Sequence, residues 1–397
     1  MTWRNARILV PLTRFLLRPW IKLEPVGLEH LPKEGSFLVI ANHVGFMDPV
    51  AIICAARRPI SWMATPSLLD EGFLARIMQW FGVIPKKKFI ADTSAIRRFK
   101  AWVKAGGIVG LFPEAVRCWD GKTAPLMPGT ERLVKMAGVP VVTVRFRNAY
   151  QQWPRWAEQV RSGVIRVEFD PPRTFERSTP DAEIMEYLTE RIAVRHYDPP
   201  QLGVRGRKLA RGITNVLWGC RSCDAFGQMR EDNDHVWCDA CGDRWRVDTS
   251  TDLIEVETGD RVRIDTFMED NLAALQARDM VPDPARFERD GVLLESEPMT
   301  LVERTDSDPL EVAEGHLRLE RETLSVCGPD GERRWSVALD ELRVVTVDMR
   351  RRLQFRTSEQ LFEAMMPTQS VVAWEIVAGH WAPRVRAQAE QRKKTRT

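Results

Sequence analysis

A histidine and an aspartate stand five positions apart, directly after an apolar run. Residues 42–48 read Asn-His-Val-Gly-Phe-Met-Asp and follow Phe37-Leu38-Val39-Ile40. Histidine takes up and releases a proton near neutral pH, and a neighbouring carboxylate fixes its tautomer and stabilises its charged form. If His43 and Asp48 form such a pair, the chain is an enzyme that activates a hydroxyl group.

The spacing restricts how these two side chains can meet. On one continuous helix they would lie about 140° apart, so pairing requires a loop that carries His43 and a helix that begins at Asp48. Pro49 also fits a helix for which Asp48 is only the N-cap. His43 alone fits an ordinary loop histidine. The pattern by itself does not decide between a catalytic pair and these structural roles.

The elements that must position this pair alternate along residues 25–200. The candidate strands are short and apolar, at 36–41, 60–64, 107–112, 140–145 and 163–169. Candidate helices begin at Asp48 and at Thr179, and a third runs from Asp92 to Ala105. The alternation predicts an α/β sandwich.

Length and composition limit the class of protein. The chain has 397 residues, with 44% hydrophobic residues, 28% charged residues and a net charge of +3. This predicts several soluble globular domains and no general affinity for nucleic acid. The cysteines are too sparse for a secreted disulfide scaffold, and no run of 18 apolar residues predicts a transmembrane helix. We therefore expect a reducing, cytoplasmic environment.

Residues 1–24 form a basic, amphipathic N-terminal segment. It carries five basic residues, no acid before Glu24, and apolar residues at helical spacing. Such a segment can lie in a membrane interface with its arginines on anionic headgroups. This predicts peripheral association with the cytoplasmic membrane, with an ordinary first helix as the alternative. Pro11 and Pro19 favour two short segments, and the interrupted apolar region argues against a cleaved signal peptide.

Four of the seven cysteines form two tight pairs. These are Cys220-x2-Cys223 and Cys238-x2-Cys241. Two such pairs supply four thiolates for a tetrahedral zinc ion, with iron and unligated thiols as alternatives. Because the protein would fill all four positions, the metal would be structural. Zinc ribbons can also bind nucleic acid or protein, although packing explains the nearby tryptophans and arginines as well.

Three further sequence blocks follow residues 42–48. They read Phe-Gly-Val-Ile-Pro-Lys-Lys-Lys at 81–88, Leu-Phe-Pro-Glu-Ala-Val-Arg at 111–117 and Val-Pro-Val-Val-Thr-Val at 139–144. Four blocks in this order resemble the glycerolipid acyltransferases, the 1-acylglycerol-3-phosphate acyltransferase family, over roughly residues 20–195. Trp119-Asp120-Gly121-Lys122 and the later cysteine pairs are similar to a bacterial branch in which a zinc-ribbon module follows the catalytic domain.

The resemblance implies an O-acyltransferase with a glycerolipid acyltransferase-type α/β sandwich. His43 would take the proton from the free hydroxyl of lysophosphatidate or a related lysophospholipid, which attacks the thioester of acyl-CoA or acyl-carrier protein. Asp48 would orient His43. The resemblance further implies that substrate is bound by Asn42, Lys86, Lys88, Phe112, Pro113, Glu114, Ala115 and Arg117.

This chain departs from the family pattern at three places. Lys88 stands where the family has an arginine, Ala115-Val116 replace Gly-Thr, and Thr143 replaces a proline. Lysine lacks the bidentate fork of arginine, and alanine is costly wherever the backbone needs a positive φ. These departures keep open a second function class, a catalytically inactive lipid-binding or scaffold protein with the same fold. Nucleic-acid binding through the zinc ribbon is a third.

The C-terminal third reads as a small mainly-β domain. Short strands and one closing helix, Val371–Trp381, predict a barrel or sandwich, with a pleckstrin-homology-like domain as one form. The expected parts of the chain are a membrane-associating segment at 1–24, an acyltransferase domain at 25–203, a basic linker at 204–217, a zinc ribbon at 218–250, a linker at 251–300, a mainly-β domain at 301–385 and a basic tail at 386–397.

Overall fold

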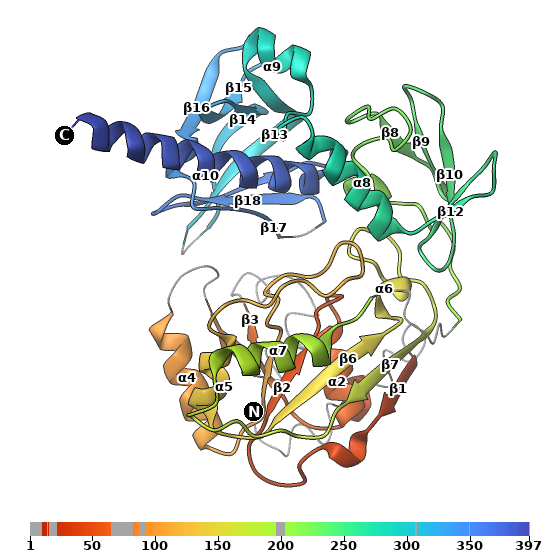
Figure 1. Cartoon of the computed structure of the whole chain (residues 1–397), viewed down its shortest axis with the longest axis vertical. Helices are drawn as coiled ribbons and strands as arrows, with labels where there is room; N and C mark the ends of the chain where they lie inside the picture. The colour runs from red at the N-terminus through yellow and green to blue at the C-terminus, as the bar shows by residue number, and fades with distance from the viewer. Residues whose placement is uncertain are drawn as a thin grey trace. The chain divides into compact units, whose positions relative to one another are not determined.

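A mixed seven-stranded sheet organises residues 22–195 (Figure 1). The strand order is β1–β7–β6–β2–β5–β3–β4. All neighbouring strands are parallel except β6 and β7. The strands are β1 Lys22–Val26, β2 Leu38–Ala41, β3 Ser61–Ala64, β4 Val83–Pro85, β5 Val109–Leu111, β6 Val141–Arg147 and β7 Val164–Phe169.

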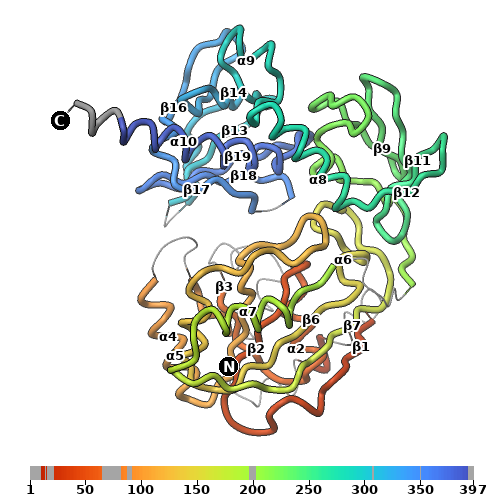
Figure 2. Tube along the Cα trace, viewed as in Figure 1, coloured from red at the N-terminus to blue at the C-terminus, as the bar shows by residue number. Residues whose placement is uncertain are grey.

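The computed structural model describes residues 10–13, 15, 22–64, 82–86, 92–195, 203–305, 308–348 and 350–396. The chain divides into two compact units, whose paths can be followed in Figure 2. The first comprises residues 1–155 and 159–207, and the second comprises residues 156–158 and 208–397. Within the described ranges, no helix is both long enough and apolar enough to cross a membrane.

Helices cover both faces of the first sheet. On one face, Leu38 and Ile40 of β2 pack in a core cluster with Phe99, Val134 and Leu188, which come from three different helices. Figure 1 shows α7 (Asp181–Ile192) in front of the sheet and α2 (Asp48–Ala56) behind it. All residues of α2 are buried. The helices are α2 Asp48–Ala56, α4 Thr93–Lys104, α5 Thr130–Ala137, α6 Ala149–Gln152 and α7 Asp181–Ile192. The predicted mixed α/β architecture is confirmed.

Strands β2 and β5 bring the first and third sequence blocks together. The two strands are adjacent and parallel, with Leu38 opposite Val109 and Ile40 opposite Leu111. Neighbouring parallel strands end at the same edge of a sheet, where α/β proteins form their sites. Residues 42–48 and 112–117 therefore leave the sheet side by side.

The N-terminal boundary of the first unit differs from the prediction. Residues 22–24, expected to end the amphipathic segment, belong to β1, where Leu23 lies opposite Ile165 of β7. The two end residues of β1 are exposed and its three central residues are half-buried, which suits a strand at the edge of the sheet. Of residues 1–21 the structure describes only 10–13 and 15, which are helical.

The cysteine segment folds into a small antiparallel sheet. Its strand order is β12–β11–β10–β9–β8. The strands are β8 Met229–Glu231, β9 His235–Cys238, β10 Arg244–Val247, β11 Leu253–Glu255 and β12 Arg261–Val262. Strand β11 pairs with β10, so this sheet extends beyond residue 250, where the sequence predicted the ribbon to end.

Residues 251–300 are ordered elements and not the predicted linker. They contain the last two strands of the small sheet, helices α8 Ile264–Gln276 and α9 Pro284–Asp290, and the start of β13 Val292–Arg304. Helix α9 is well specified locally. The side chain of Asp283 accepts the backbone N–H of Arg286, Pro284 opens the helix, and Gly291 ends it at φ 73°.

A second seven-stranded sheet, antiparallel throughout, completes the second unit. Its order is β16–β15–β14–β13–β19–β18–β17. Its remaining strands are β14 Leu310–Glu320, β15 Thr323–Cys327, β16 Arg333–Ala338, β17 Val344–Val347, β18 Arg352–Arg356 and β19 Leu361–Met365. Helix α10, Val371–Arg396, contacts β17 and β18. The predicted basic tail from 386 is thus helical, because its Ala, Gln, Glu, Arg and Lys residues are good helix formers. The pleckstrin-homology-like form stays a prediction.

Candidate active site

His43 and Asp48 are in direct contact. The Nδ1 atom of His43 lies 2.9 Å from Oδ2 of Asp48. The same carboxylate oxygen accepts the backbone N–H groups of Val44 at 2.7 Å and Gly45 at 2.8 Å. A carboxylate only accepts, so Nδ1 carries the proton and Nε2 is left as the basic nitrogen of the neutral ring.

Asp48 is not the N-cap that the sequence predicted. It is the first residue of α2, whose N-cap is Met47, and Pro49 follows it. A capping side chain accepts N–H groups from inside its helix. The Asp48 carboxylate instead accepts N–H groups from the loop before the helix. The loop histidine and the helix-borne aspartate meet as the spacing requires.

The surroundings of His43 favour its neutral form. Burial lowers the pKa of the imidazole, and the pairing with Asp48 opposes this effect. Arg117 and Arg155 add smaller contributions that also lower this pKa. The side chain nevertheless keeps 18% of its surface exposed. An imidazole that is neutral, oriented and partly accessible can accept a proton from a hydroxyl group.

Glu114 fixes the backbone on both sides of the site. Its Oε1 accepts the N–H of His43 at 2.5 Å, and its Oε2 accepts the N–H of Ala124 at 2.6 Å. The residue is only 2% exposed. Burial raises the pKa of this carboxyl to about 8, against the opposing effect of the two N–H groups. Both oxygens thus hold protein backbone, although the family resemblance implied substrate contact for Glu114.

The aromatic ring of Phe112 lies between two other rings. Its centroid is 4.1 Å from that of His43 and 4.4 Å from that of Trp62, and both pairs are stacked. The sequence marked Phe112 but not Trp62, which is 1% exposed on β3. No sequence signal identifies Trp62, because the contact depends on the order of β2, β5 and β3 in the sheet.

Other predicted substrate-binding residues lie around the same edge. The N–H of Met127 donates to the carbonyl of Pro113 at 2.8 Å. The carbonyl of Arg117 accepts Nη1 of Arg155 at 2.9 Å, and the Arg155 guanidinium lies 3.8 Å from the ring centre of Trp119. Arg155 thereby holds the backbone at Arg117.

Asn42 and the second sequence block have different positions. Asn42 is 2% exposed, and its Oδ1 accepts the N–H of Phe146, which ties the end of β2 to β6. Lys86 is exposed and follows β4, at the same edge as His43. Lys88 lies outside the described residues. Substrate contact stays a prediction for all three.

Thr143, which stands where the family pattern has a proline, makes hydrogen bonds with Asp170. Thr143 lies in β6, and its hydroxyl donates to Oδ2 of Asp170 at 2.7 Å. The carbonyl of Thr143 also accepts the N–H of Asp170. Thr143 is fully buried, so this pair satisfies polar groups inside the sheet.

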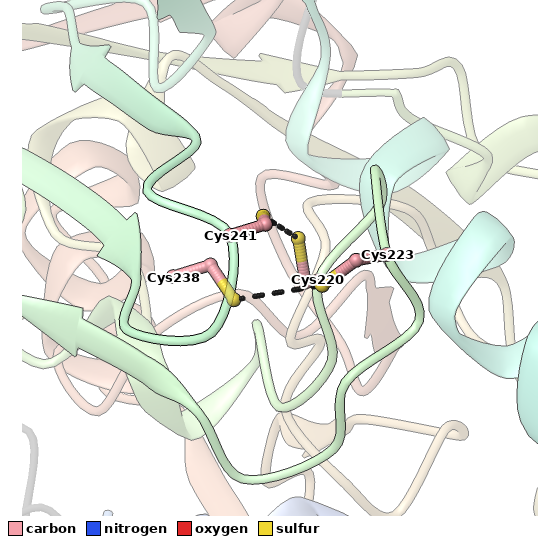
Figure 3. Close-up of side chains that lie close together, drawn as sticks. All are labelled: Cys220, Cys223, Cys238 and Cys241. Carbon is pink, nitrogen blue, oxygen red and sulfur yellow. Dashed lines mark hydrogen bonds between the residues drawn. The ribbon is translucent and has the colours of Figure 1, made fainter.

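The four paired cysteines converge in the second unit, as Figure 3 shows. Their sulfur atoms all lie within 4.8 Å of one another. The sulfurs of Cys220 and Cys241 are 3.6 Å apart, and those of Cys223 and Cys238 are 3.8 Å apart. Zinc–sulfur bonds of about 2.3 Å in a tetrahedron place sulfurs about 3.8 Å apart. The cluster therefore fits a four-thiolate metal ion.

The replacement of glycine at position 115 leaves measurable backbone strain. Ala115 has φ 57°, a left-handed conformation that glycine adopts without cost. We expect Ala115→Gly to raise the free energy of unfolding by about 0.5–1 kcal/mol, because relief of strain exceeds the added chain entropy. Ala105→Gly is the control, since the exposed Ala105 has φ −79° and should be destabilised. Urea titration measures both, and a destabilised Ala115→Gly variant contradicts the expectation.

Part of the chain is similar in sequence to known proteins. A model of the acyltransferase family matches residues 22–147. The chain is 28% identical over 130 residues to a 1-acyl-sn-glycerol-3-phosphate acyltransferase of Borreliella burgdorferi, covering 32% of this chain and 52% of that protein. It is 23% identical over 145 residues to the Bacillus subtilis protein of the same name, covering 36% of this chain and 70% of that one.

The chain is also similar to a mycobacterial protein and to one solved structure. An uncharacterized protein of Mycobacterium tuberculosis is 42% identical over 121 residues, which are 28% of this chain and 32% of that protein. The crystal structure of the 1-acyl-sn-glycerophosphate acyltransferase of Thermotoga maritima matches with a TM-score of 0.41 and 20% identity, covering 47% of this chain and 76% of that one. The chain spans about half the length of the Borreliella protein. Residues 22–147 of this chain are thus similar to the acyltransferase family.

Proposed function

We propose that the first unit transfers a fatty acyl group to the free hydroxyl of lysophosphatidate or a related lysophospholipid. The contact of 2.9 Å between His43 Nδ1 and Asp48 Oδ2, beside a partly exposed imidazole, carries this proposal. The acyl donor is a thioester, either acyl-CoA or acyl-carrier protein. The names of the similar acyltransferases support the acceptor class.

The reaction needs no covalent enzyme intermediate. Nε2 of His43 accepts the hydroxyl proton while the acceptor oxygen attacks the thioester carbonyl. Asp48 stabilises the imidazolium that forms. The carbon–sulfur bond then breaks, and the proton passes from His43 to the leaving thiolate. An ester and a free thiol are the products, so atoms and charge balance.

Arg117 and Glu114, which both follow β5, have different roles in this proposal. Arg117 provides a guanidinium for the anionic headgroup of the acceptor, since arginine binds phosphate with two parallel hydrogen bonds. Glu114 is a positioning residue, because both of its oxygens hold backbone N–H groups. With its pKa raised to about 8, Glu114 is mostly neutral near neutral pH and adds little repulsion toward a phosphate.

Substitution of the proposed base and its orienter tests the mechanism. Purified protein is incubated with labelled acyl-CoA or acyl-carrier protein and a panel of lysolipids. His43→Ala should reduce kcat about 10²–10⁴-fold, because proton transfer by a positioned base contributes that much. Asp48→Asn should also lose most activity, since an amide still accepts the loop N–H groups but cannot stabilise the imidazolium.

The control for this assay is His30→Ala. His30 belongs to the same unit, and its Nδ1 contacts the carbonyl of Phe169 at 2.8 Å, which is a structural role. This variant should keep its activity. Full activity in His43→Ala would refute the mechanism. A correctly folded wild-type protein that is inactive with every donor and acceptor would favour the alternative, a lipid-binding or scaffold protein.

We propose that the four cysteines hold a structural zinc ion. Zinc would fix the two cysteine turns and take no part in acyl transfer. Metal analysis should find one zinc per chain, and Cys238→Ser should abolish it and unfold the small sheet. Cys327→Ala, outside the cluster, should keep the metal. Iron in the purified protein would contradict zinc, and unchanged zinc in Cys238→Ser would contradict the site.

We also propose that the N-terminal segment binds the phospholipid surface that presents the acceptor. Among its described residues, Leu12 is 47% exposed and Phe15 is 72% exposed. Such side chains insert at the boundary of headgroups and acyl chains. Leu12→Ser with Phe15→Ser should weaken sedimentation with anionic phospholipid vesicles, whereas Val160→Ser, which alters another exposed apolar residue, should not. Equal sedimentation of all variants would exclude this contact.

A further inference from the structure

Three aromatic rings from three adjacent strands form one continuous stack. Trp62 lies on β3, Phe112 follows β5, and His43 follows β2. The ring planes of Trp62 and Phe112 differ by 10°, and those of Phe112 and His43 by 14°. Since β5 lies between β2 and β3, the stack runs across the carboxyl edge of the sheet to the proposed base.

We propose that Trp62 is a positioning residue for acyl transfer, which holds Phe112 flat against His43 and so fixes the orientation of the imidazole and shields one of its faces. This inference rests on the proposed role of His43 as the base. No residue of the four sequence blocks contributes the outer ring of the stack.

The sheet is built to admit the ring of Trp62. Gly110 of β5 lies beneath it, and a Cβ atom at this position would stand 2.5 Å from Cε3 of Trp62. A larger residue would therefore displace the indole from Phe112. The close approach of Trp62 therefore explains why glycine is needed at position 110, whatever its backbone angles.

The contact depends on the indole ring and not on its N–H group. Trp62 is 1% exposed, and its Nε1 has no hydrogen-bond partner among the described residues. An unpaired buried donor is destabilising, so the N–H group adds nothing to the fold. A phenyl ring at position 62 can keep the stack and removes the unpaired donor.

The stack accounts for part of the burial around His43. Burial is the largest cause of the lowered pKa of the imidazole. Asp48, on the Nδ1 side, raises this pKa, and Arg117 and Arg155 lower it. Glu114 contacts the backbone N–H of His43 and, with a pKa of about 8, changes charge only toward the alkaline side. Below that range the aromatic shield can be tested on its own.

Loss of the outer ring should therefore move the titration of the base. Without Trp62, Phe112 can tilt, and water reaches the imidazole. Hydration favours the charged form, so the pKa of His43 should rise and less neutral base should be present under mildly acidic conditions. Activity would then fall more at low pH than at high pH, which a simple loss of stability does not produce.

The experiment compares Trp62→Leu with Trp62→Phe in the full chain. The pH dependence of kcat/KM is measured from pH 5.5 to 7, below the range in which Glu114 changes charge. Trp62→Leu should lose about three- to tenfold more activity at pH 5.5 than at pH 7, with its acid limb moved to higher pH. The acid limb of the Trp62→Phe profile should lie at the same pH as that of the wild type. Phe99→Leu, which removes a fully buried ring on α4, should lower thermal stability without moving the limb.

A second measurement does not depend on catalysis. NMR titration of the histidine rings, assigned with His43→Ala among the six histidines, gives the pKa of His43 in each variant. A raised pKa in Trp62→Leu and a wild-type value in Trp62→Phe support the inference. Equal values in all three proteins overturn it. If Trp62→Leu does not fold, Trp62→Met takes its place, because its flexible side chain fills more of the space.

The two proposals fail in different ways. Activity that persists in His43→Ala would refute the proposed function, while the NMR titration would still test the stack. An inactive His43→Ala beside an unmoved titration in Trp62→Leu would refute only the role of Trp62.

Discussion

One carboxylate oxygen organises the candidate active site. Oδ2 of Asp48 accepts the N–H groups of Val44 and Gly45 and the Nδ1 proton of His43. Asp48 itself is held because it opens α2, whose residues are all buried against the sheet. The buried helix therefore holds Asp48 in place, and the Asp48 carboxylate holds both the loop backbone and the imidazole. This is the preorganisation that general-base chemistry requires, since a ring free to rotate would lose its geometry.

The positions that the sequence predicted well are those whose signals are local. The strand that precedes His43 is a short apolar run, and Asp92 and Ala105 are the caps of α4. Each cysteine pair is recognisable from its two-residue spacing, and the structure brings the two pairs together. By contrast, the dipeptide Asp48-Pro49 does not show where the helix begins. The same two residues occur when aspartate is the N-cap and when it is the first residue of the helix, as here. Only the geometry of the preceding loop separates the two arrangements.

The features that the sequence missed depend on contacts between distant residues or on weak composition signals. Trp62 could not be placed beside His43 without knowing that β5 lies between β2 and β3. The role of Glu114 likewise appears only when its oxygens are seen to hold the backbone of His43 and Ala124. Residues 251–300 looked like a linker because of their acidic composition, although Asp283-Pro284 and Gly291 carry start and stop signals for α9. A search for paired helix boundaries, in place of overall polarity, would have found that helix.

The pairing of β1 with β7 has a consequence for how the protein is made. Lys22 lies opposite Val164, 142 positions later in the chain. At a synthesis rate of about 5–20 residues per second, β1 waits on the order of ten seconds for its partner to leave the ribosome. During that interval the first sheet cannot close at this edge. Its closure therefore waits until most of the first unit has been synthesised.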